Sequence, residues 1–327
     1  MKLHVSAMLW LTAFVPLTAH ADTVVDQRQI FEGRNVYAPT LLFDSQENIY
    51  KMWYGGWQSQ SDYPNDSVYY RTSSDGYNWS SPQTVLSPGQ VAPDAIHIND
   101  PSVTKTMNGV NGEYQYTMFY VNCVAPCNNY SQNQIWSAVS SDGINWQYHQ
   151  PLITDSQGAS TPSAVVDPQS DGTFWKVYYS NTTEDGAQPV TVFLAKIGGN
   201  RSVISEDEPV FKFPKLNGGV MANPDVKFVA GSWQLFFNVY NVIPGFRHTT
   251  HDIYKVRSST NMSWSADDVV PLIVNNPAGN VCGTIAPGIL PIDSPGQYLI
   301  QFGQTPYSGG DCDLSQQSSM QQWIWQD

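Results

Sequence analysis

Short runs of apolar residues, broken by polar turn residues, fill the chain from about residue 24 onward. Aromatic and β-branched residues dominate the runs at 50–54, 114–121, 175–179, 233–240 and 298–302, which is typical of β-strands. Two of the turns, at 74–79 and 141–146, share the motif Ser-Asp-Gly-x-Asn-Trp, and 258–264 is a degenerate copy. The pattern therefore predicts an all-β protein of short antiparallel strands.

One unit of roughly 62 residues occurs five times along the chain. Each unit begins with an X-Pro dipeptide at the start of an apolar run, and the five prolines are 61 to 63 residues apart. The dipeptides are Ala38-Pro39, Asp100-Pro101, Thr161-Pro162, Asn223-Pro224 and Ala286-Pro287. Four short strands per unit, with one aromatic turn motif, are typical of a propeller blade, so we expect a five-bladed β-propeller.

The two ends of the repeat region predict how the ring closes. Residues 24–32 lie where a fourth strand is expected before the first unit, and residues 321–325 lie where the third strand of the last unit is expected. The N-terminal strand should therefore complete the last blade and cover two exposed sheet edges. We expect a single propeller domain over residues 22–327.

The first 21 residues resemble a signal peptide. A positive start at Lys2 is followed by an apolar stretch over 5–17 and by Ala19-His20-Ala21, a small-x-small cleavage signal. The apolar stretch is too short for a membrane span. We expect removal of residues 1–21, no membrane span, and a secreted or periplasmic protein.

The formal charge of −13 argues against nucleic acid as a partner, because polyanions bind to basic surfaces. Charged residues make up 13% of the chain and aromatic residues another 13%, a balance that favours a carbohydrate partner for an exported protein. We expect no cofactor and a monomer.

The propeller topology brings one set of loops to a single mouth. These loops connect the second and third strands of each blade or lead into the X-Pro dipeptides. They carry Trp57, Asp62, Tyr63, Asp66, Tyr130, Glu184, Asp185, Tyr240, Arg247, His248, His251, Asp311 and Asp313. The four cysteines also map there, and we expect disulfides Cys123–Cys127 and Cys282–Cys312, with zinc at the Cys123-x-x-x-Cys127 spacing as the alternative.

The chain resembles the five-bladed propeller glycoside hydrolases, the superfamily of families 43, 62, 32, 68, 117 and 130. The resemblance rests on the segments 98–103 (Ile-Asn-Asp-Pro-Ser-Val) and 51–56 (Lys-Met-Trp-Tyr-Gly-Gly) and on the two Ser-Asp-Gly-x-Asn-Trp turns. It implies an acid at the start of an inner strand as base, nucleophile or transition-state stabiliser, and a second carboxylic acid as proton donor. Ala38 and Thr161 stand where family 43 generally has its base and its acid, so no single family is assigned.

Asp100 is the only acid among the five X-Pro positions, and we predict that it takes part in catalysis. The alternative is that it caps its own turn. Glycoside hydrolysis ordinarily needs two carboxyl groups, and the candidates for the second are Glu184 and Asp225. An ordinary solvated loop position for Glu184 and a hydrogen-bonded inner-strand position for Asp225 are the alternatives.

Five further residues are predicted to bind substrate: Trp57, His97, Arg247, His248 and His251. Trp57 is expected to stack on a sugar ring, with packing between blades as the alternative. His97, His251 and Asp100 are also an alternative ligand set for a metal, although we expect none. The leading hypothesis is an exported glycoside hydrolase, and the alternative is a non-catalytic glycan-binding propeller.

Overall fold

A computed structural model describes residues 23–57, 65–110, 114–127, 130–154, 158–181, 190–213, 221–241, 250–274, 281–292, 296–306 and 317–326. At the edges of several of these ranges only the backbone is described. The predicted signal peptide lies outside the described residues.

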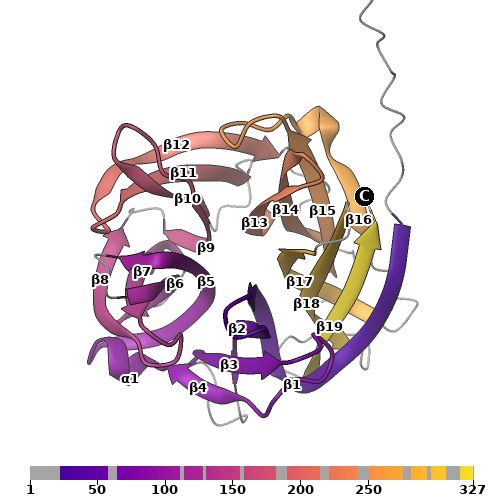
Figure 1. Cartoon of the computed structure of the whole chain (residues 1–327), viewed down its shortest axis with the longest axis horizontal. Coiled ribbons are helices and arrows are strands. Elements are labelled where there is room, and N and C mark those ends of the chain that lie inside the picture. The colour runs from indigo at the N-terminus through magenta and orange to yellow at the C-terminus, as the bar shows by residue number, and fades with distance from the viewer. Residues whose placement is uncertain are drawn as a thin grey trace, which may run out of the picture.

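Four-stranded antiparallel sheets are arranged as blades around a central axis (Figure 1). The first blade consists of the second half of β1 (Thr23–Asp44), β2 (Ile49–Trp57), β3 (Ser67–Ser73) and β4 (Gln83–Leu86). The second consists of β5 (Ala95–Val110), β6 (Tyr114–Val124), β7 (Asn133–Ser140) and β8 (Gln147–Ile153). The third consists of β9 (Ala159–Val166), β10 (Thr173–Asn181), β11 (Val190–Gly198) and β12 (Val203–Phe213). The fourth blade consists of β13 (Met221–Val229), β14 (Ser232–Asn241), β15 (Thr250–Ser258) and β16 (Val270–Ile273). The fifth consists of β17 (Val281–Pro291), β18 (Gln297–Pro306), β19 (Gln317–Gln326) and the first half of β1. The predicted five-bladed propeller is confirmed.

In the described ranges, helical structure is confined to short connections. The α-helix α1 (Pro88–Val91) joins the first two blades, and two 3-10 turns cover Tyr130–Gln132 and Ala266–Asp268. Among the described residues, no helix has the length and hydropathy that a membrane-spanning segment needs.

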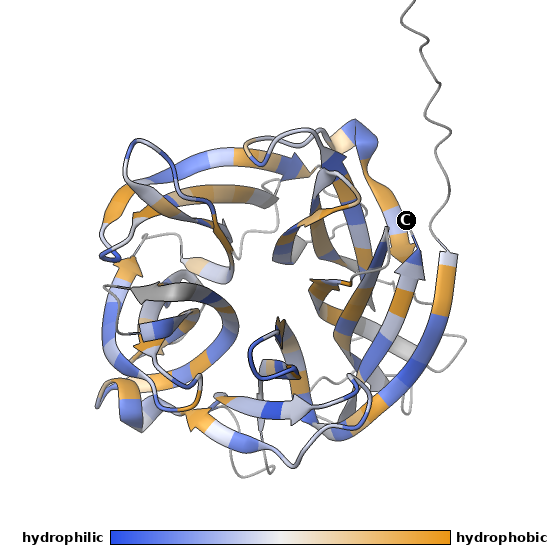
Figure 2. Cartoon of the chain, in the orientation of Figure 1, coloured by the Kyte–Doolittle hydropathy of each residue, from blue (hydrophilic) through white to orange (hydrophobic). Residues whose placement is uncertain are grey.

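The core lies between neighbouring blades, where alternate residues of the strands pack face to face. Figure 2 shows this as alternating apolar and polar bands along the strands. Trp53 of the first blade packs with Tyr116 of the second, and Phe119 of the second packs with Trp175 of the third. Because every blade is covered on both faces, its second strand is buried along most of its length.

The X-Pro dipeptide forms the same β-bulge in all five blades. Between β1 and β2, for example, Tyr37 pairs with Gly55 and Thr40 pairs with Trp53. The inner strand thus advances by three residues where its neighbour advances by two, and it carries one extra residue at this point. The same jump occurs in the other four blades. The residue before each proline has a left-handed φ, between 47° and 56°. The extra residue bends the strand and turns the dipeptide toward the axis.

Side chains that directly follow the prolines connect each inner strand to the next one. Ser102 Oγ accepts a hydrogen bond from Ala164 N (2.8 Å), and Ser163 Oγ accepts one from Val226 N (2.9 Å). The equivalent contacts join Thr40 Oγ1 to Pro101 O and Ile289 N to Asp225 Oδ2. At the equivalent position of the fifth blade, Gly288 lies so close to Pro39 that a Cβ atom would be 1.8 Å from the Pro39 carbonyl oxygen.

Strand β1 closes the ring as predicted. Its first half pairs with β19 as the outermost strand of the fifth blade, and its second half pairs with β2 as the innermost strand of the first blade. Figure 1 shows β1 running along β19 and continuing toward β2. The first and last strands of the described chain therefore share one sheet.

The Ser-Asp-Gly-x-Asn-Trp turns are held by their aspartates. Asp142 Oδ1 accepts hydrogen bonds from the backbone N–H groups of Ile144 and Asn145, each over 2.8 Å, and Asp75 makes the same contacts in the first blade. The carbonyl oxygen of Gly143 in turn accepts a hydrogen bond from Trp53 Nε1 (2.8 Å). The turn of one blade is thus fixed to the second strand of the blade before it.

Candidate functional site

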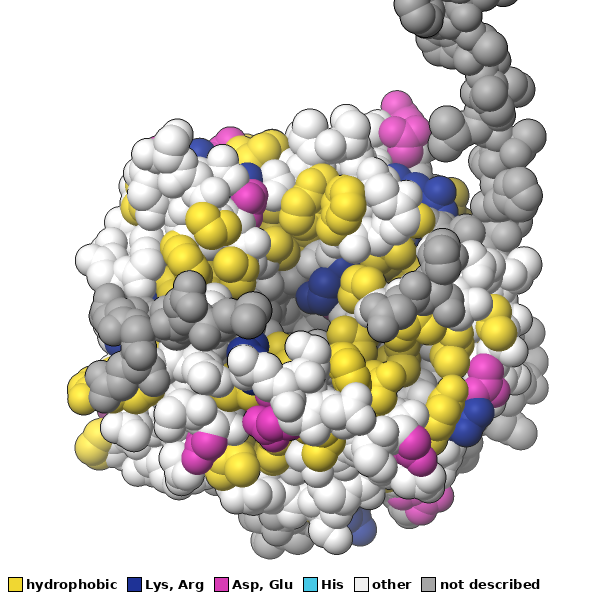
Figure 3. Space-filling view, in the orientation of Figure 1, with side chains coloured by type: hydrophobic (Ala, Val, Ile, Leu, Met, Phe, Trp, Pro, Cys, Tyr) yellow, Lys and Arg dark blue, Asp and Glu magenta, His cyan; other side chains and the backbone are white. Residues whose placement is uncertain are grey.

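Asp100 lies at the axis, where the five X-Pro dipeptides line a narrow cavity of about 30 Å³. Its side chain is buried, with 8% of its surface exposed. Asn223, the residue before proline in the fourth blade, donates a hydrogen bond from Nδ2 to Asp100 Oδ1 over 3.3 Å. In the orientation of Figure 3, the centre of the molecule is hollowed.

A second buried carboxyl group, that of Asp66, belongs to the same site. Asp66 directly precedes β3 and is also 8% exposed. Its backbone carbonyl accepts a hydrogen bond from Ile98 N of β5 (3.1 Å), which fixes it beside the strand that carries Asp100. Asn35 donates from Nδ2 to Asp66 Oδ1 over 3.2 Å.

Tyr37 and Asn99 lie between the two aspartates. Asn99 precedes Asp100 in the chain and donates a hydrogen bond from Nδ2 to the Tyr37 hydroxyl oxygen (3.0 Å). The Tyr37 hydroxyl is in turn hydrogen-bonded to the Asp66 carboxyl. Burial and the charges of Asp66 and Asp100 raise the pKa of Tyr37 well above its ordinary value, so this hydroxyl stays protonated and donates to the carboxyl.

Both aspartates have strongly raised pKa values. Burial raises the pKa of Asp66 to about 7, although the polar side chains of Tyr37, Trp57 and Asn35 beside it act in the other direction. Burial, together with the charge of Asp66, raises the pKa of Asp100 to about 7, although the hydrogen bond from Asn223 acts in the other direction. Because the two groups interact, they titrate as a pair. Near neutral pH the pair therefore holds a proton that an ordinary aspartate would have lost.

Two asparagines near Asp100 carry buried polar atoms that have no hydrogen-bond partner in the described residues. One of them precedes Asp100 in the chain, and the other lies on the neighbouring strand. Asn99 Oδ1 and both polar atoms of the Asn122 side chain have no hydrogen-bond partner in the described part of the chain. Asn122 lies on β6, opposite Ile98 of β5. Buried amides in native proteins are normally paired with protein, water or ligand, so a buried water molecule is the natural partner of these atoms.

Asp225, one of the two predicted partners of Asp100, lines the same axial cavity but is fully engaged by other groups. Its Oδ2 accepts from Ile289 N (2.7 Å), and its Oδ1 accepts from Ser163 Oγ (3.0 Å) and from Lys227 Nζ (2.6 Å). These contacts join three blades and pair the carboxylate with a cation. They favour the hydrogen-bonded inner-strand alternative over a role as proton donor.

His97 lies on β5 beside the disulfide of the second blade. Cys123 and Cys127 form this disulfide, with Cα atoms 5.7 Å apart, as predicted. His97 Nδ1 is 3.9 Å from Cys127 Sγ, and its Nε2 is 3.4 Å from Asn133 Oδ1. Burial lowers the pKa of His97, which favours a neutral ring. The three side chains form a cluster of metal-ligand types, but both sulfur atoms are already bonded to each other, so they do not fit the zinc alternative.

Trp57 is only 7% exposed and offers little free ring surface to a sugar at the mouth. Its side chain contacts the Asp66 carboxyl instead. Of the other predicted substrate-binding residues, Arg247 and His248 lie outside the described residues, as does the predicted acid Glu184, and only the backbone of His251 is described. Cys312 and the side chain of Cys282 are likewise outside them.

Sequence reasoning placed Asp66 at the mouth but did not single it out as the partner of Asp100. The usable signal was its position, immediately before the third strand of the first blade, where a loop returns to the axis. What the sequence does not display is the link through Tyr37 and Asn99, which belong to different blades.

Sequence comparison identifies no relative of this chain. No protein-family model matches it, and no curated protein sequence matches it significantly.

Solved structures of similar fold are numerous. An endo-1,4-beta-xylanase from Bacteroides thetaiotaomicron superimposes with a TM-score of 0.64 at 16% identity, covering 90% of this chain and 91% of that one. A family 43 endo-arabinanase from Bacillus licheniformis gives 0.57 at 14% identity, with 90% and 95% coverage. An alpha-L-arabinofuranosidase from Lactobacillus brevis gives 0.60 at 10% identity, with 89% and 91% coverage. This chain therefore has, over nearly its whole length, the five-bladed propeller fold of these glycoside hydrolases.

Proposed function

We propose that this protein is a glycoside hydrolase whose catalytic carboxyl groups are Asp66 and Asp100. One observation carries the proposal: two carboxyl groups, each buried and each with a pKa raised to about 7, lie close enough to interact electrostatically. Catalytic acids and bases need pKa values near the working pH, and buried carboxyl pairs commonly provide them. The propeller fold shared with known glycosidases is consistent with this chemistry.

Hydrolysis of a glycosidic bond requires one protonated and one ionised carboxyl group. Near neutral pH the pair retains a proton, which can be given to the leaving oxygen. The ionised partner then activates a water molecule or attacks the sugar directly. Tyr37 and Asn99 position the pair through the hydrogen bonds that connect them.

The substrate class is taken from the fold neighbours as a starting point. Their names describe arabinanases, a xylanase and an arabinofuranosidase, so arabinans and xylans are the first polysaccharides to test. Fructans, mannans and bacterial exopolysaccharides extend the panel. The sequence features that predict export are compatible with a polymeric substrate outside the cytoplasm, and the Cys123–Cys127 disulfide supports such a location.

Reducing-sugar release from this panel tests the proposal. We expect release by the wild type and a loss of at least about 100-fold in the Asp66→Asn and Asp100→Asn variants, because each removes an ionisable member of the pair. Asp94→Asn is the matched control, since Asp94 is exposed just before β5 and lies outside the pair. Full activity in a folded Asp100→Asn variant would exclude the proposed mechanism.

The non-catalytic alternative makes a different prediction. Ala38 and Thr161 supply no acid at two of the axial positions, which favours a glycan-binding propeller if no hydrolysis is found. Binding of a polysaccharide by the wild type with no release of reducing ends would support that function.

A further inference from the structure

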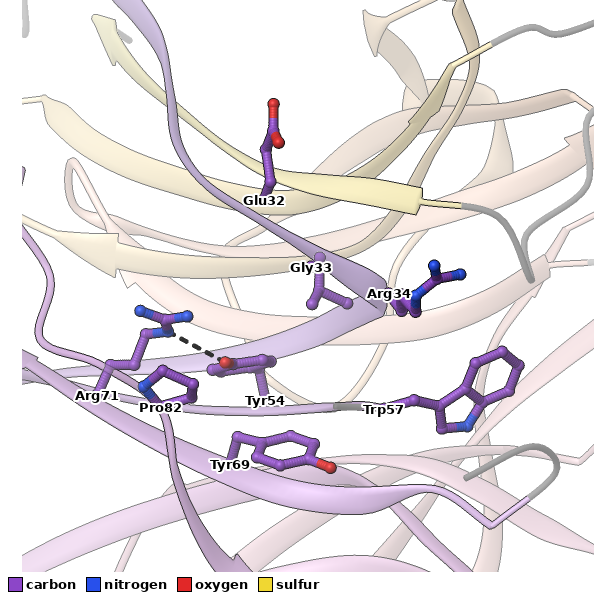
Figure 4. A pocket seen from close by; sticks show the side chains of 9 residues that line it. Glu32, Gly33, Arg34, Tyr54, Trp57, Tyr69, Arg71 and Pro82 are labelled. Atoms are coloured by element: carbon purple, nitrogen blue, oxygen red, sulfur yellow. Dashed lines mark hydrogen bonds between the residues drawn. The ribbon is translucent and has the colours of Figure 1, made fainter. Parts of the chain in front are cut away.

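A pocket of about 510 Å³ opens between the first and fifth blades, beside the candidate catalytic site. It is lined by β1, which crosses from one blade to the other, and by β2 and β3 (Figure 4). Its volume is within the range of small-molecule binding sites. The lining residues are aromatic or charged for the most part: Glu32, Gly33, Arg34, Val36, Tyr54, Trp57, Tyr69, Arg71 and Pro82.

We propose that this pocket binds a carboxylated sugar, a uronic acid unit, through the guanidinium group of Arg71. Arg71 is 9% exposed, although arginine is rarely buried without a charged partner. Its Nε donates to the Tyr54 hydroxyl (3.0 Å), as Figure 4 shows, and its Nη1 donates to Ser80 O. One face of the group lies over the Phe31 ring, 4.0 Å from the ring centroid.

These contacts fix the guanidinium but leave part of it unused. Its second amino group, Nη2, has no hydrogen-bond partner among the described residues, and none of its described partners is an anion. A carboxylate would supply both the missing acceptor and the missing negative charge. Arginine binds carboxylates strongly, and the bond is stronger where water is excluded.

The charge of the pocket is opposite to that of the whole chain. Arg34 and Arg71 outweigh Glu32 in the lining, whereas the protein carries a formal charge of −13. The acidic remainder of the surface repels long polyanions. The pocket is therefore suited to a single anionic unit, such as the end or side group of an oligosaccharide.

Aromatic side chains supply the apolar part of a sugar site. Tyr54 and Tyr69 lie side by side, with ring centroids 5.7 Å apart, and Trp57 lies toward Arg34 in Figure 4. Both tyrosines are largely buried, so only the ring edges that line the pocket can pack against the C–H groups of a sugar. A sugar ring with a carboxylate matches both parts of the pocket. Trp57 also contacts Asp66, so the two sites are neighbours but have different binding groups.

Calorimetric titration with two matched disaccharides tests the proposal, one ending in glucuronic acid and the other in glucose. We expect the acidic disaccharide to bind at least about tenfold more tightly, because only it can form a charge-assisted hydrogen bond with Arg71. Arg71→Gln should remove this preference. Arg28→Gln is the control, since Arg28 is an exposed arginine of β1 that pairs with Asp26 and does not line the pocket.

Two further measurements keep the outcome decisive. If Arg71→Gln does not fold, the wild-type arginine Nε–H and tryptophan indole resonances should shift on titration with the acidic disaccharide and not with the neutral one. Binding should persist in Asp100→Asn, which separates this site from the proposed catalytic pair. Equal affinity for both disaccharides, or an unchanged preference in a folded Arg71→Gln variant, would overturn the proposal and leave the proposed hydrolase function untouched.

Discussion

Buried aspartates in this protein differ in whether a cation accompanies them. Asp44 is 2% exposed, and burial acts to raise its pKa, but hydrogen bonds from Lys105, Tyr116 and Lys51 hold the pKa below its usual range. Asp66 and Asp100 are buried to a similar degree, and their described hydrogen-bond partners are neutral side chains. The protein thus stabilises one carboxylate for structure and leaves two others ready to bind protons.

Removing the charge of Asp66 should lower the pKa of Asp100. In Asp66→Asn the electrostatic contribution of Asp66 disappears, while burial and the hydrogen bond from Asn223 remain. We expect the apparent pKa of Asp100 to move from about 7 toward its ordinary value. Carbon NMR of labelled aspartate carboxyl groups measures this shift. An unchanged pKa would mean that the two groups do not interact.

Asp100→Asn should stabilise the protein at alkaline pH. The folded-state pKa of about 7 lies above the unfolded value, so the folded protein holds a proton that the unfolded chain has lost. Wild-type stability therefore falls as pH rises from about 4 to about 7, and asparagine avoids this loss. We expect a gain on the order of 1–3 kcal/mol at pH 8 and little gain at pH 4.

Denaturant unfolding at both pH values measures this difference. The same group links the activity to pH, since loss of the shared proton above about pH 7 should end general acid catalysis. A variant that is less stable than the wild type at pH 8 would indicate that the carboxylate is stabilised by contacts in the folded protein.

Of the two proposed catalytic residues, the sequence predicts Asp100 but not Asp66. Asp100 stands out because the other four residues before proline carry no charge. Asp66 does not stand out, because its raised pKa depends on burial and on contacts with Asn35 and Tyr37 that only the closed ring creates. The role of Asp100 was predictable because the repeat offers four other residues to compare it with. The role of Asp66 was not predictable, because its pKa is set by burial in the folded protein.

At the scale of elements, the strands and turns follow from the sequence, but the bulges do not. Periodic aromatic and β-branched runs predict the blades, and the aspartate of each Ser-Asp-Gly-x-Asn-Trp turn predicts its hydrogen bonds. Nothing in Ala38, Thr161 or Ala286 favours a left-handed backbone, yet all three adopt one. Their conformation is imposed by the pairing of the inner strand with its neighbour.

The two turn glycines provide a matched test of contacts between blades. Gly76 and Gly143 occupy equivalent turns with φ values of 75° and 78°, so alanine is strained at both. A Cβ at Gly76 would lie 3.5 Å from Tyr50, an ordinary contact, whereas one at Gly143 would lie 2.8 Å from Trp53 of the neighbouring blade. We expect Gly76→Ala to cost about 1 kcal/mol. Gly143→Ala should cost roughly 1–3 kcal/mol more.

Chemical denaturation of both variants measures the difference. Loss of the Trp53 indole contact with the Gly143 carbonyl should also change the tryptophan fluorescence of Gly143→Ala and not that of Gly76→Ala. Equal destabilisation of the two variants would show that the turn does not bear on the neighbouring blade.

At the scale of the whole molecule, the ring closes between the fifth and first blades, and two glycines make this possible. A Cβ at Gly288 would lie 1.8 Å from Pro39 O, and one at Gly303 would lie 2.1 Å from Val36 O. Both glycines belong to the fifth blade, and both carbonyl groups belong to β1. The last blade therefore approaches the first through backbone alone at these points.

Gly288→Ala should disrupt this closure. Because the obstructing atom is backbone, it cannot move aside as a flexible side chain would, and we expect a cost of about 3 kcal/mol or more. Gly89→Ala is the control, since nothing lies within 4 Å of a Cβ there. Hydrogen exchange should show earlier opening of β1 and β17 in Gly288→Ala. Retained protection of both strands would contradict the proposed role of this glycine.

Strand β1 also sets the order in which the molecule can be finished during synthesis. Residues 23–34 are the first of the described chain to leave the ribosome, and their partners, residues 317–326, are the last of it to be made. Four blades have time to form while this segment waits unpaired, and the final docking step joins the first and last strands of the described chain at once. A nascent chain stalled before β19 would expose an open sheet edge at each end, which makes truncated products natural targets for chaperones and proteases.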